Sequence, residues 1–321
     1  GRNQIEQALS LEPTFITLWI GNNDVLGYAA SGGTSGTDAA TQSLPTDIPT
    51  FTYLYNVVAD AITDTSGYRK IAVANIPDVQ IIPYFTTVGP KMAVGIQGLM
   101  SVDPRVQGLV FQRNGETVGT GLVTPDNLAT GKVLITLTGG QITSLLGDTE
   151  GKYYASIGET PPAGIDVNMP FGFHPQNPWP DKYILDQDEI VVTQDATTAF
   201  NTVISDVVEK YDSWVLVDVN EFFNDLKAAE ASTGGMIIDG IKFNTSFILG
   251  NTFSLDGVHP TTQGHGIIAN EFISAINSEF SASIPRIDLS TLPSSIPLAK
   301  RNVASKSAFI LKNCTWKDIL L

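Results

Sequence analysis

The stretch Phe15-Ile16-Thr17-Leu18-Trp19-Ile20, followed directly by Gly21-Asn22-Asn23-Asp24, indicates the class of fold. Its first six residues form an apolar run of strand length, which predicts a strand buried on both faces of a sheet. The polar turn that follows stands at the carboxyl end of that strand. In open α/β sheets, ligands bind at this end of the strands.

Two further strands of the same kind are expected downstream, at Ile71-Ala72-Val73-Ala74-Asn75-Ile76 and at Trp214-Val215-Leu216-Val217-Asp218-Val219. Between the first two strands, apolar residues recur at helical spacing from Phe51 to Ile62, and Gly67 ends the helix. Strand, helix, strand makes a parallel right-handed unit the default. The polar residues Asn23, Asp78 and Asn220 should therefore lie on one rim of a parallel sheet.

The remaining core helices follow from the same periodicity. A long helix should begin between Asp186 and Asp195, and a shorter one should span 222–229. A final helix should start near Thr261, and 236–251 reads as an irregular segment. The buried positions expected in the long and final helices are Phe200, Val203, Ile204, Val207, Val208, Tyr211, Ile268, Phe272, Ala275 and Ile276.

The pattern changes between the two halves of this α/β core. Runs such as Leu109-Val110-Phe111 and 133–137 lie between Gly and Pro clusters, which predicts a β-rich insertion or cap. His174 falls there, in an aromatic loop. The predicted division is 1–85 for the first part of the core, 86–180 for the insertion, 181–284 for the second part of the core and 285–321 for a basic C-terminal tail. That tail is either a genuine extension or a readthrough or misframed sequence.

Composition narrows the function. The 321 residues are 42% hydrophobic and 16% charged, as in an ordered globular protein. Acidic residues outnumber basic ones 33 to 18, so the net charge of -15 disfavours nucleic acid as a partner. No apolar run reaches the length of a membrane span. One cysteine, Cys314, cannot form an intrachain disulfide or a cysteine-based zinc site.

The chemistry is predicted at Phe253-Ser254-Leu255-Asp256-Gly257-Val258-His259-Pro260. An Asp three residues before a His sets a carboxylate beside an imidazole on one loop. The carboxylate can accept the Nδ1 proton, which leaves Nε2 free as a general base. Gly257 allows a sharp turn, and Pro260 precedes a helix start. His265 is expected on the surface of that helix, without a catalytic role.

Taken together, these motifs resemble the SGNH or GDSL-type esterases and acylhydrolases. Gly21-Asn22-Asn23-Asp24 matches the family's Gly-x-Asn-Asp block, and Asp256-Gly257-Val258-His259-Pro260 matches its Asp-x-x-His block, in the family's order. The resemblance covers about 13–85 and 180–280. It implies a three-layer, flavodoxin-like α/β fold, and the chain is most similar to the large bacterial members.

The resemblance also implies roles. His259 would be the general base, Asp256 its orienting carboxylate and Asn23 a side-chain donor to the oxyanion. Gly21, Asn22 and Asp24 would support the turn, with Asn22 and Asp24 holding it by side-chain to backbone bonds. No metal or organic cofactor is needed.

The family's nucleophilic Ser belongs to a Gly-Asp-Ser or Gly-Asn-Ser block on its first strand, upstream of the position of Gly21. This chain holds no such block. Ser35 lacks the glycine of a nucleophile elbow, and Gly147-Asp148-Thr149 has Thr in place of Ser. The chain is therefore expected to be an N-terminally truncated piece without first strands or nucleophile. It should be inactive alone, with an exposed flank on the Phe15 strand.

The expected function of the intact parent is serine-type hydrolysis of an acetylated carbohydrate, a short-chain ester or a lipid. The resemblance implies a secreted, periplasmic or surface-lipoprotein location, and the oligomeric state stays open. Two alternatives remain: a metallophosphoesterase, which needs several His ligands, and a non-enzymatic binding protein or degenerate scaffold.

Overall fold

A three-stranded parallel sheet forms the centre of the α/β part of this protein, in the order β1-β2-β7. The strands are β1 (Phe15–Leu18), β2 (Lys70–Ala74) and β7 (Trp214–Val217). Leu18 pairs with Val73, and Val73 pairs with Leu216, so the three strands are in register and run in one direction. The predicted parallel α/β architecture is present, and the carboxyl ends of all three strands meet at one edge.

The computed structural model describes residues 3–33, 44–64, 66–113 and 116–293. These residues divide into two units, which we describe separately. The first unit comprises 3–29, 44–64, 66–82 and 191–293, and contains the parallel sheet. The second comprises 30–33, 83–113 and 116–190, where the sequence predicts an insertion over 86–180.

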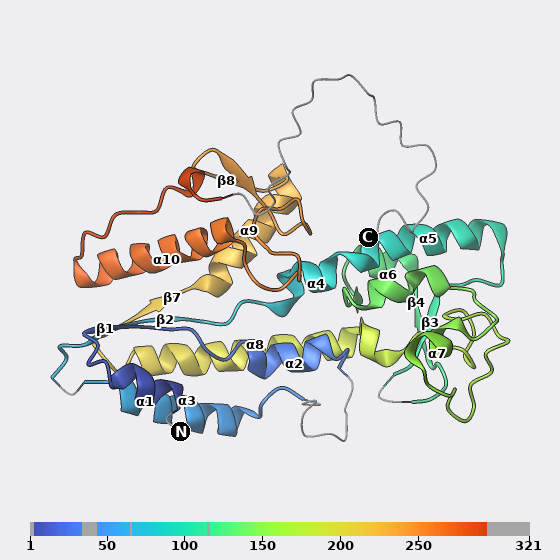
Figure 1. Cartoon of the computed structure of the whole chain (residues 1–321), viewed down its shortest axis with the longest axis horizontal. Helices are drawn as coiled ribbons and strands as arrows, with labels where there is room; N and C mark the ends of the chain where they lie inside the picture. The colour runs from blue at the N-terminus through green and yellow to red at the C-terminus, as the bar shows by residue number, and fades with distance from the viewer. Residues whose placement is uncertain (1–2, 34–43, 65, 114–115, 294–321) are drawn as a thin grey trace. The chain divides into compact units, whose positions relative to one another are not determined.

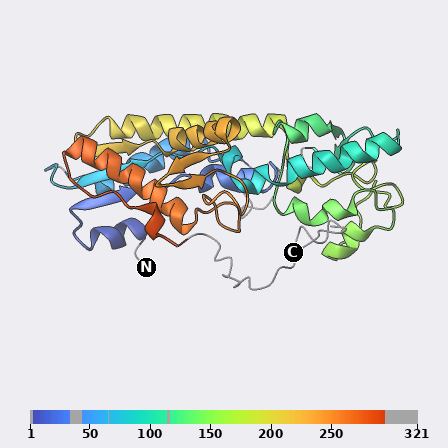
Figure 2. The same cartoon turned by 90° about the horizontal axis from the view of Figure 1, so that it is seen from above.

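Helices cover both faces of the sheet in the first unit (Figure 1). Helices α9 and α10 lie on one face, and α3 and α8 lie on the other. Seen from above, the orange helix α10 lies in front of the sheet (Figure 2). The helical elements of this unit are α1 (Gln4–Leu9), α2 (Asn23–Ala30), α3 (Ile48–Ile62), η1 (Val79–Ile81), α8 (Gln187–Val208, from Val191), α9 (Val219–Thr233), α10 (Thr262–Phe280) and η4 (Leu289–Thr291).

The strands differ in burial. The last four residues of β2 are fully buried, as expected for the central strand of a covered sheet. β1 differs from the prediction, because Phe15 and Thr17 are exposed and only Leu18 is buried. β1 is an edge strand, and among the described residues it pairs with β2 alone, but β7 at the other edge is almost fully buried.

Aromatic side chains pack helices α3 and α8 together on one face of the sheet. Phe51 of α3 stacks on Phe200 of α8, with ring centroids 4.0 Å apart. Both side chains are buried, as the helical periodicity predicts. Gly21 approaches the same cluster with φ +106°, and a Cβ atom there would lie 2.8 Å from Ile76 and 3.1 Å from Phe51. A glycine is therefore required where β1 turns toward α2.

A β-hairpin, absent from the prediction, follows α9. Strands β8 (Met236–Ile238) and β9 (Ile241–Phe243) pair antiparallel across Asp239 and Gly240. Both turn residues have positive φ, +51° and +77°. Asp-Gly between two short segments that contain isoleucine is a local hairpin signal, so the sequence held a signal for this element.

The second unit contains more helix than strand, so the prediction of a β-rich insertion is wrong. Its elements are α4 (Pro83–Thr86), α5 (Val88–Val102), β3 (Leu109–Phe111), β4 (Gly121–Val123), α6 (Pro125–Ala129), β5 (Leu134–Ile135), η2 (Gly139–Leu145), α7 (Lys152–Ile157), η3 (Asp181–Tyr183) and β6 (Ile184–Leu185). In α5, Val88, Met92 and Ile96 share a buried helical face.

Residues 285–293, predicted to belong to a separate tail, pack in the first unit. Asn270 of α10 bonds both backbone groups of Ile287, at 2.8 and 2.9 Å, and Leu289 is fully buried. The rest of the predicted tail, 294–321, lies outside the described residues. Within the described part of the chain, no helix has the length and apolar character to cross a bilayer.

Candidate active site

The Asp256 and His259 side chains meet as the sequence predicts. Asp256 Oδ2 lies 2.6 Å from His259 Nδ1. The side chain of His259 is 77% exposed, and among the described residues its Nε2 atom has no hydrogen-bond partner. The carboxylate therefore holds the ring by one nitrogen and leaves the other accessible, which is the arrangement that a general base needs.

The loop that carries this pair is closed at its base by the backbone. Phe253 and Pro260 form an antiparallel bridge, and the Ser254 N–H donates to the His259 carbonyl at 2.7 Å. Gly257 has φ +71°, so it takes the left-handed conformation that the sharp turn requires. The loop is thus a tight hairpin with the imidazole on its returning arm.

Asp256 has four hydrogen-bond donors within this loop. The backbone N–H groups of Val258 and His259 each donate to Oδ1 at 2.9 Å, and the Ser254 hydroxyl donates at 2.7 Å. Burial opposes ionisation of this carboxyl, but these donors and the imidazole together lower its pKa below the ordinary 3.8. Asp256 is therefore a fixed anion at neutral pH.

Two contacts anchor the loop to its neighbours. Phe253 stacks on Phe223, with ring centroids 5.6 Å apart, and Phe223 lies near the start of α9. Because α9 leaves the end of β7, this contact places the base of the loop near the carboxyl edge of the sheet. Thr261 caps α10, its hydroxyl accepting from the Gly264 N–H at 2.9 Å.

Asn23 is the first residue of α2, and its side chain is exposed at the end of β1. In the described part of the chain it makes no hydrogen bond to Asp256 or His259. The supporting turn differs from the expectation, because Asp24 accepts from the Thr46 hydroxyl at 2.6 Å and, among the described residues, from no backbone group of the turn. The Oδ1 atom of Asn22 is buried without a partner among the described residues.

Asn75 connects several polar groups at the carboxyl edge of the sheet, and the sequence analysis did not predict this role. Asn75, buried at the end of β2, donates to Asp218 at 2.8 Å and accepts from the N–H of Asn220 at 2.8 Å. Asn220 in turn donates to the Ile76 carbonyl at 2.8 Å. The signal was a polar residue ending a buried strand, since such a group needs partners.

Asp78 lies on the same rim as a carboxyl in a partly buried position. It caps η1, accepting from the Gln80 N–H at 2.8 Å. Burial raises its pKa above the ordinary value, and the bonds from Gln80 only partly oppose that effect. Its contacts are those of a structural cap.

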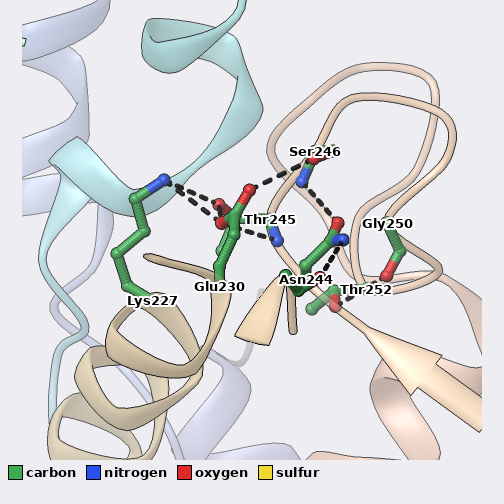
Figure 3. A network of polar contacts seen from close by, with 8 residues as sticks. Lys227, Glu230, Asn244, Thr245, Ser246, Gly250 and Thr252 are labelled. Atoms are coloured by element: carbon green, nitrogen blue, oxygen red, sulfur yellow. Dashed lines mark hydrogen bonds and ion pairs between the residues drawn. The ribbon is translucent and has the colours of Figure 1, made fainter. Parts of the chain in front are cut away.

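A second network fixes the segment just before the loop of Asp256 and His259 (Figure 3). Glu230 of α9 accepts from the backbone and hydroxyl of Thr245, from the Ser246 hydroxyl at 3.1 Å and from Lys227 Nζ at 3.2 Å. Burial raises the pKa of Glu230, but these donors lower it overall. The network holds 244–252 on α9, and that segment leads into the Asp256 loop.

One hollow in the first unit is acidic and lies apart from these residues. It has a volume of about 300 Å³ and is bounded by α9 and α10. Its charged lining is Asp218, Glu221, Asp225 and Glu271. Asn23, Asp256 and His259 are not among its lining residues, so this hollow is not part of the candidate site.

The other candidates from the sequence have local roles. His265 is exposed on α10, and its Nδ1 lies 2.9 Å from the Thr261 carbonyl. His174 Nδ1 accepts from the Gln176 N–H within a turn. Asp148 accepts from the backbone of Lys152 at the start of α7, and Ser35 lies outside the described residues. Among those that are described, no group of three or more His, Cys, Asp or Glu could hold a metal ion.

Comparison with known proteins gave no match to a protein-family model, to a curated protein or to a solved structure.

Proposed function

We propose that this chain carries the general base and the oxyanion amide of a serine-type ester hydrolase of the SGNH/GDSL kind. One observation supports the proposal above the others: the 2.6 Å contact between Asp256 and His259, with the second ring nitrogen accessible. This contact has the geometry of the acid and base of a serine hydrolase triad.

In the proposed reaction, a serine hydroxyl attacks the ester carbonyl and gives its proton to Nε2 of His259. The imidazolium then protonates the leaving alcohol, and an acyl-enzyme remains. His259 next takes a proton from water, whose oxygen attacks the acyl group; the imidazolium then returns this proton to the departing serine oxygen, and the acid is released. Asp256 accepts the hydrogen bond from Nδ1–H of His259 throughout, and its negative charge stabilises the positively charged ring.

Asn23 is proposed as a donor to the negative oxygen of the tetrahedral intermediate. It follows β1, whereas the His259 loop is anchored beside the end of β7, two strands away. Two strand spacings amount to about 10 Å, a gap that an ester group and the attacking serine can fill. An amide donor suits this role because it is neither acid nor base.

The nucleophilic serine is proposed to lie outside this chain, as the resemblance implies. Ser254 is the serine nearest to the pair in sequence, but its hydroxyl donates to Asp256. Among the described residues no hydroxyl contacts Nε2 of His259. The substrate classes that we propose are those of the resemblance, namely an acetylated carbohydrate, a short-chain ester or a lipid, met outside the cytoplasm.

A fluorophosphonate probe, which reacts with activated serines, tests this proposal. We expect a product extended upstream of Gly1 to be labelled and to hydrolyse p-nitrophenyl esters. His259→Ala in that product should abolish both signals, and His265→Ala should change neither. The 321-residue chain alone should show neither. Ester turnover by the 321-residue chain alone would contradict the proposal. An extended product that binds glycan or lipid but is not labelled would also contradict it, and would favour the binding-protein alternative.

A further inference from the structure

The edge strand β1 leaves one side of its backbone without a strand partner among the described residues. The Lys70 N–H donates to the Thr14 carbonyl at 3.0 Å, so the backbone groups of Thr14 point toward β2. Successive residues of a strand direct these groups to opposite sides, which turns the N–H and C=O groups of Phe15 and Thr17 away from β2. An open edge of this kind is a template for another strand.

Helix α3 carries apolar side chains on the side that faces away from α8. Lys210, just after α8, donates to the Asn56 side chain at 2.8 Å, which marks the side of α3 next to α8. Leu54 lies two residues before Asn56, about 160° away around the helix, and Val57 follows Leu54 on the same face. Both are exposed. Because α3 connects β1 to β2 and α8 leads into β7, this side of α3 lies toward the β1 edge.

The open edge and this helix face form one apolar surface, which we call the edge surface and define as Leu11, Phe15, Tyr53, Leu54 and Val57. The exposed fractions of these residues range from 38% for Phe15 to 81% for Leu11. Helix α1, which leads to Leu11 and contacts α3 (Figure 1), buries none of its own residues. Taking roughly 150–200 Å² for one such side chain in full exposure, the edge surface amounts to about 500 Å². That area is near the upper end of what a monomeric protein exposes in one apolar patch.

No charge interrupts the two segments that carry most of this surface. Residues 13–20 and 48–58 contain no Asp, Glu, Lys or Arg, although the net charge of the chain is -15. Two copies with this charge repel each other over most of their surfaces, so they can approach through a neutral, apolar face. The open backbone groups of β1 also need a peptide as their partner, because neither a small ligand nor a lipid supplies a ladder of N–H and C=O groups.

We propose that the edge surface binds a second copy of this chain, with β1 of one copy pairing antiparallel with β1 of the other across a twofold axis. Such an axis is perpendicular to the sheet, so α3 stays on the same face in both copies and packs against its counterpart. The arrangement joins two three-stranded sheets into one continuous sheet. The apolar area of about 500 Å², together with the paired backbone, approaches the roughly 800 Å² per partner of a stable dimer.

Sedimentation velocity tests the proposal on the 321-residue chain alone, because a strand supplied by an extended product would compete for the same edge. The measured quantity is the oligomeric state, so the result is independent of the proposed hydrolase activity. Leu54→Glu places a charge in the contact. Leu122→Glu is its matched control, because the two leucines are 52% and 54% exposed and Leu122 lies in β4 of the second unit. Thr17→Pro removes an N–H that points away from β2, so it breaks no hydrogen bond of the sheet within one copy. Circular dichroism verifies the fold of each variant.

We expect the wild type to sediment as a dimer, Leu54→Glu and Thr17→Pro to raise the dissociation constant about tenfold or more, and Leu122→Glu to leave it unchanged. Hydrogen exchange gives a second measurement: the N–H groups of Phe15 and Thr17 should exchange slowly in the wild-type dimer and fast in Leu54→Glu. A monomeric wild type would overturn the proposal and leave the edge to a different partner. Equal dissociation constants of Leu54→Glu and Leu122→Glu, wild-type dimerisation of Thr17→Pro or fast exchange of Thr17 in the dimer would overturn it as well.

Discussion

The side-chain amide of Asn201 bonds both backbone groups of Ile76: its Oδ1 accepts from the N–H and its Nδ2 donates to the C=O, each at 2.8 Å. Asn201 belongs to α8, and Ile76 follows β2, so one amide replaces a missing strand partner at the carboxyl edge of the sheet. Asn277 makes the same pair of bonds to Ile284, at 2.8 and 2.9 Å, near the surface.

This pair of asparagines gives a matched prediction. Asn201→Ala should lower the free energy of unfolding by about 2–3 kcal/mol, because it leaves a buried N–H without its acceptor. Asn277→Ala should cost less than about 1 kcal/mol, since water can replace the amide at an exposed site. Urea unfolding followed by circular dichroism measures both. Equal losses would show that burial does not decide the value of this contact.

Such contacts mark the limit of prediction from this sequence. The three core strands and the helix that ends at Ile62 were predicted because each contains an apolar run or stripe long enough to be recognised in the sequence. Asn201 and Asn75 were not, because a single amide inside an apolar pattern carries no periodic signal. Their roles depend on which strand end lies opposite, which only the tertiary structure specifies.

The candidate site divides in the same way. The contact between Asp256 and His259 was predicted because three residues and a glycine fix its geometry locally. The bond of Asp24 to Thr46 was not, because it spans 22 residues of sequence and depends on how the chain returns to α3. The Glu230 network also joins distant segments, and no short motif announces it.

Glu189 predicts how stability depends on pH. Burial raises its pKa to about 8, and the nearby Asp186 and Asp181 reinforce the shift. Between its ordinary pKa of 4.5 and about 8, the folded state keeps a proton that the unfolded state has lost, so stability falls as the pH rises. The Asp186 N–H donates to this side chain at 2.6 Å, as in a capping box, and glutamine can accept the same bond.

We therefore expect Glu189→Gln to gain stability relative to the wild type on going from pH 5 to pH 8, by about 2 kcal/mol or more. Urea unfolding at the two pH values measures the difference. Glu116→Gln, at an exposed glutamate in the same unit, should show no such trend. A constant difference between Glu189→Gln and the wild type would mean that Glu189 is ionised in the folded protein.

Glu230 predicts a local loss of order. Glu230→Ala removes the acceptor for Thr245 and Ser246, so the segment 244–252 should open more readily. We expect amide hydrogen exchange of Thr245 to accelerate about tenfold or more, with β2 unchanged. Glu230→Gln keeps an acceptor and should exchange at an intermediate rate. Unchanged exchange in Glu230→Ala would show that the network does not restrain the loop.

Asp256→Asn separates orientation of the imidazole from its presence. The carboxylate accepts the Nδ1 proton of His259, whereas an amide can instead donate to that nitrogen and favour the wrong tautomer. In the 321-residue chain, ¹⁵N NMR of His259 should show protonated Nδ1 in the neutral ring of the wild type and a changed tautomer in the variant. In a catalytically competent extended product, kcat should fall by on the order of 10⁴.

Ser254→Ala is the control, because it removes only one of the four donors to Asp256. We expect it to lower kcat by about tenfold and to leave the tautomer of His259 unchanged. An Asp256→Asn protein with the wild-type tautomer would show that the 2.6 Å contact does not set the state of the ring, and the proposed base would lose its structural support.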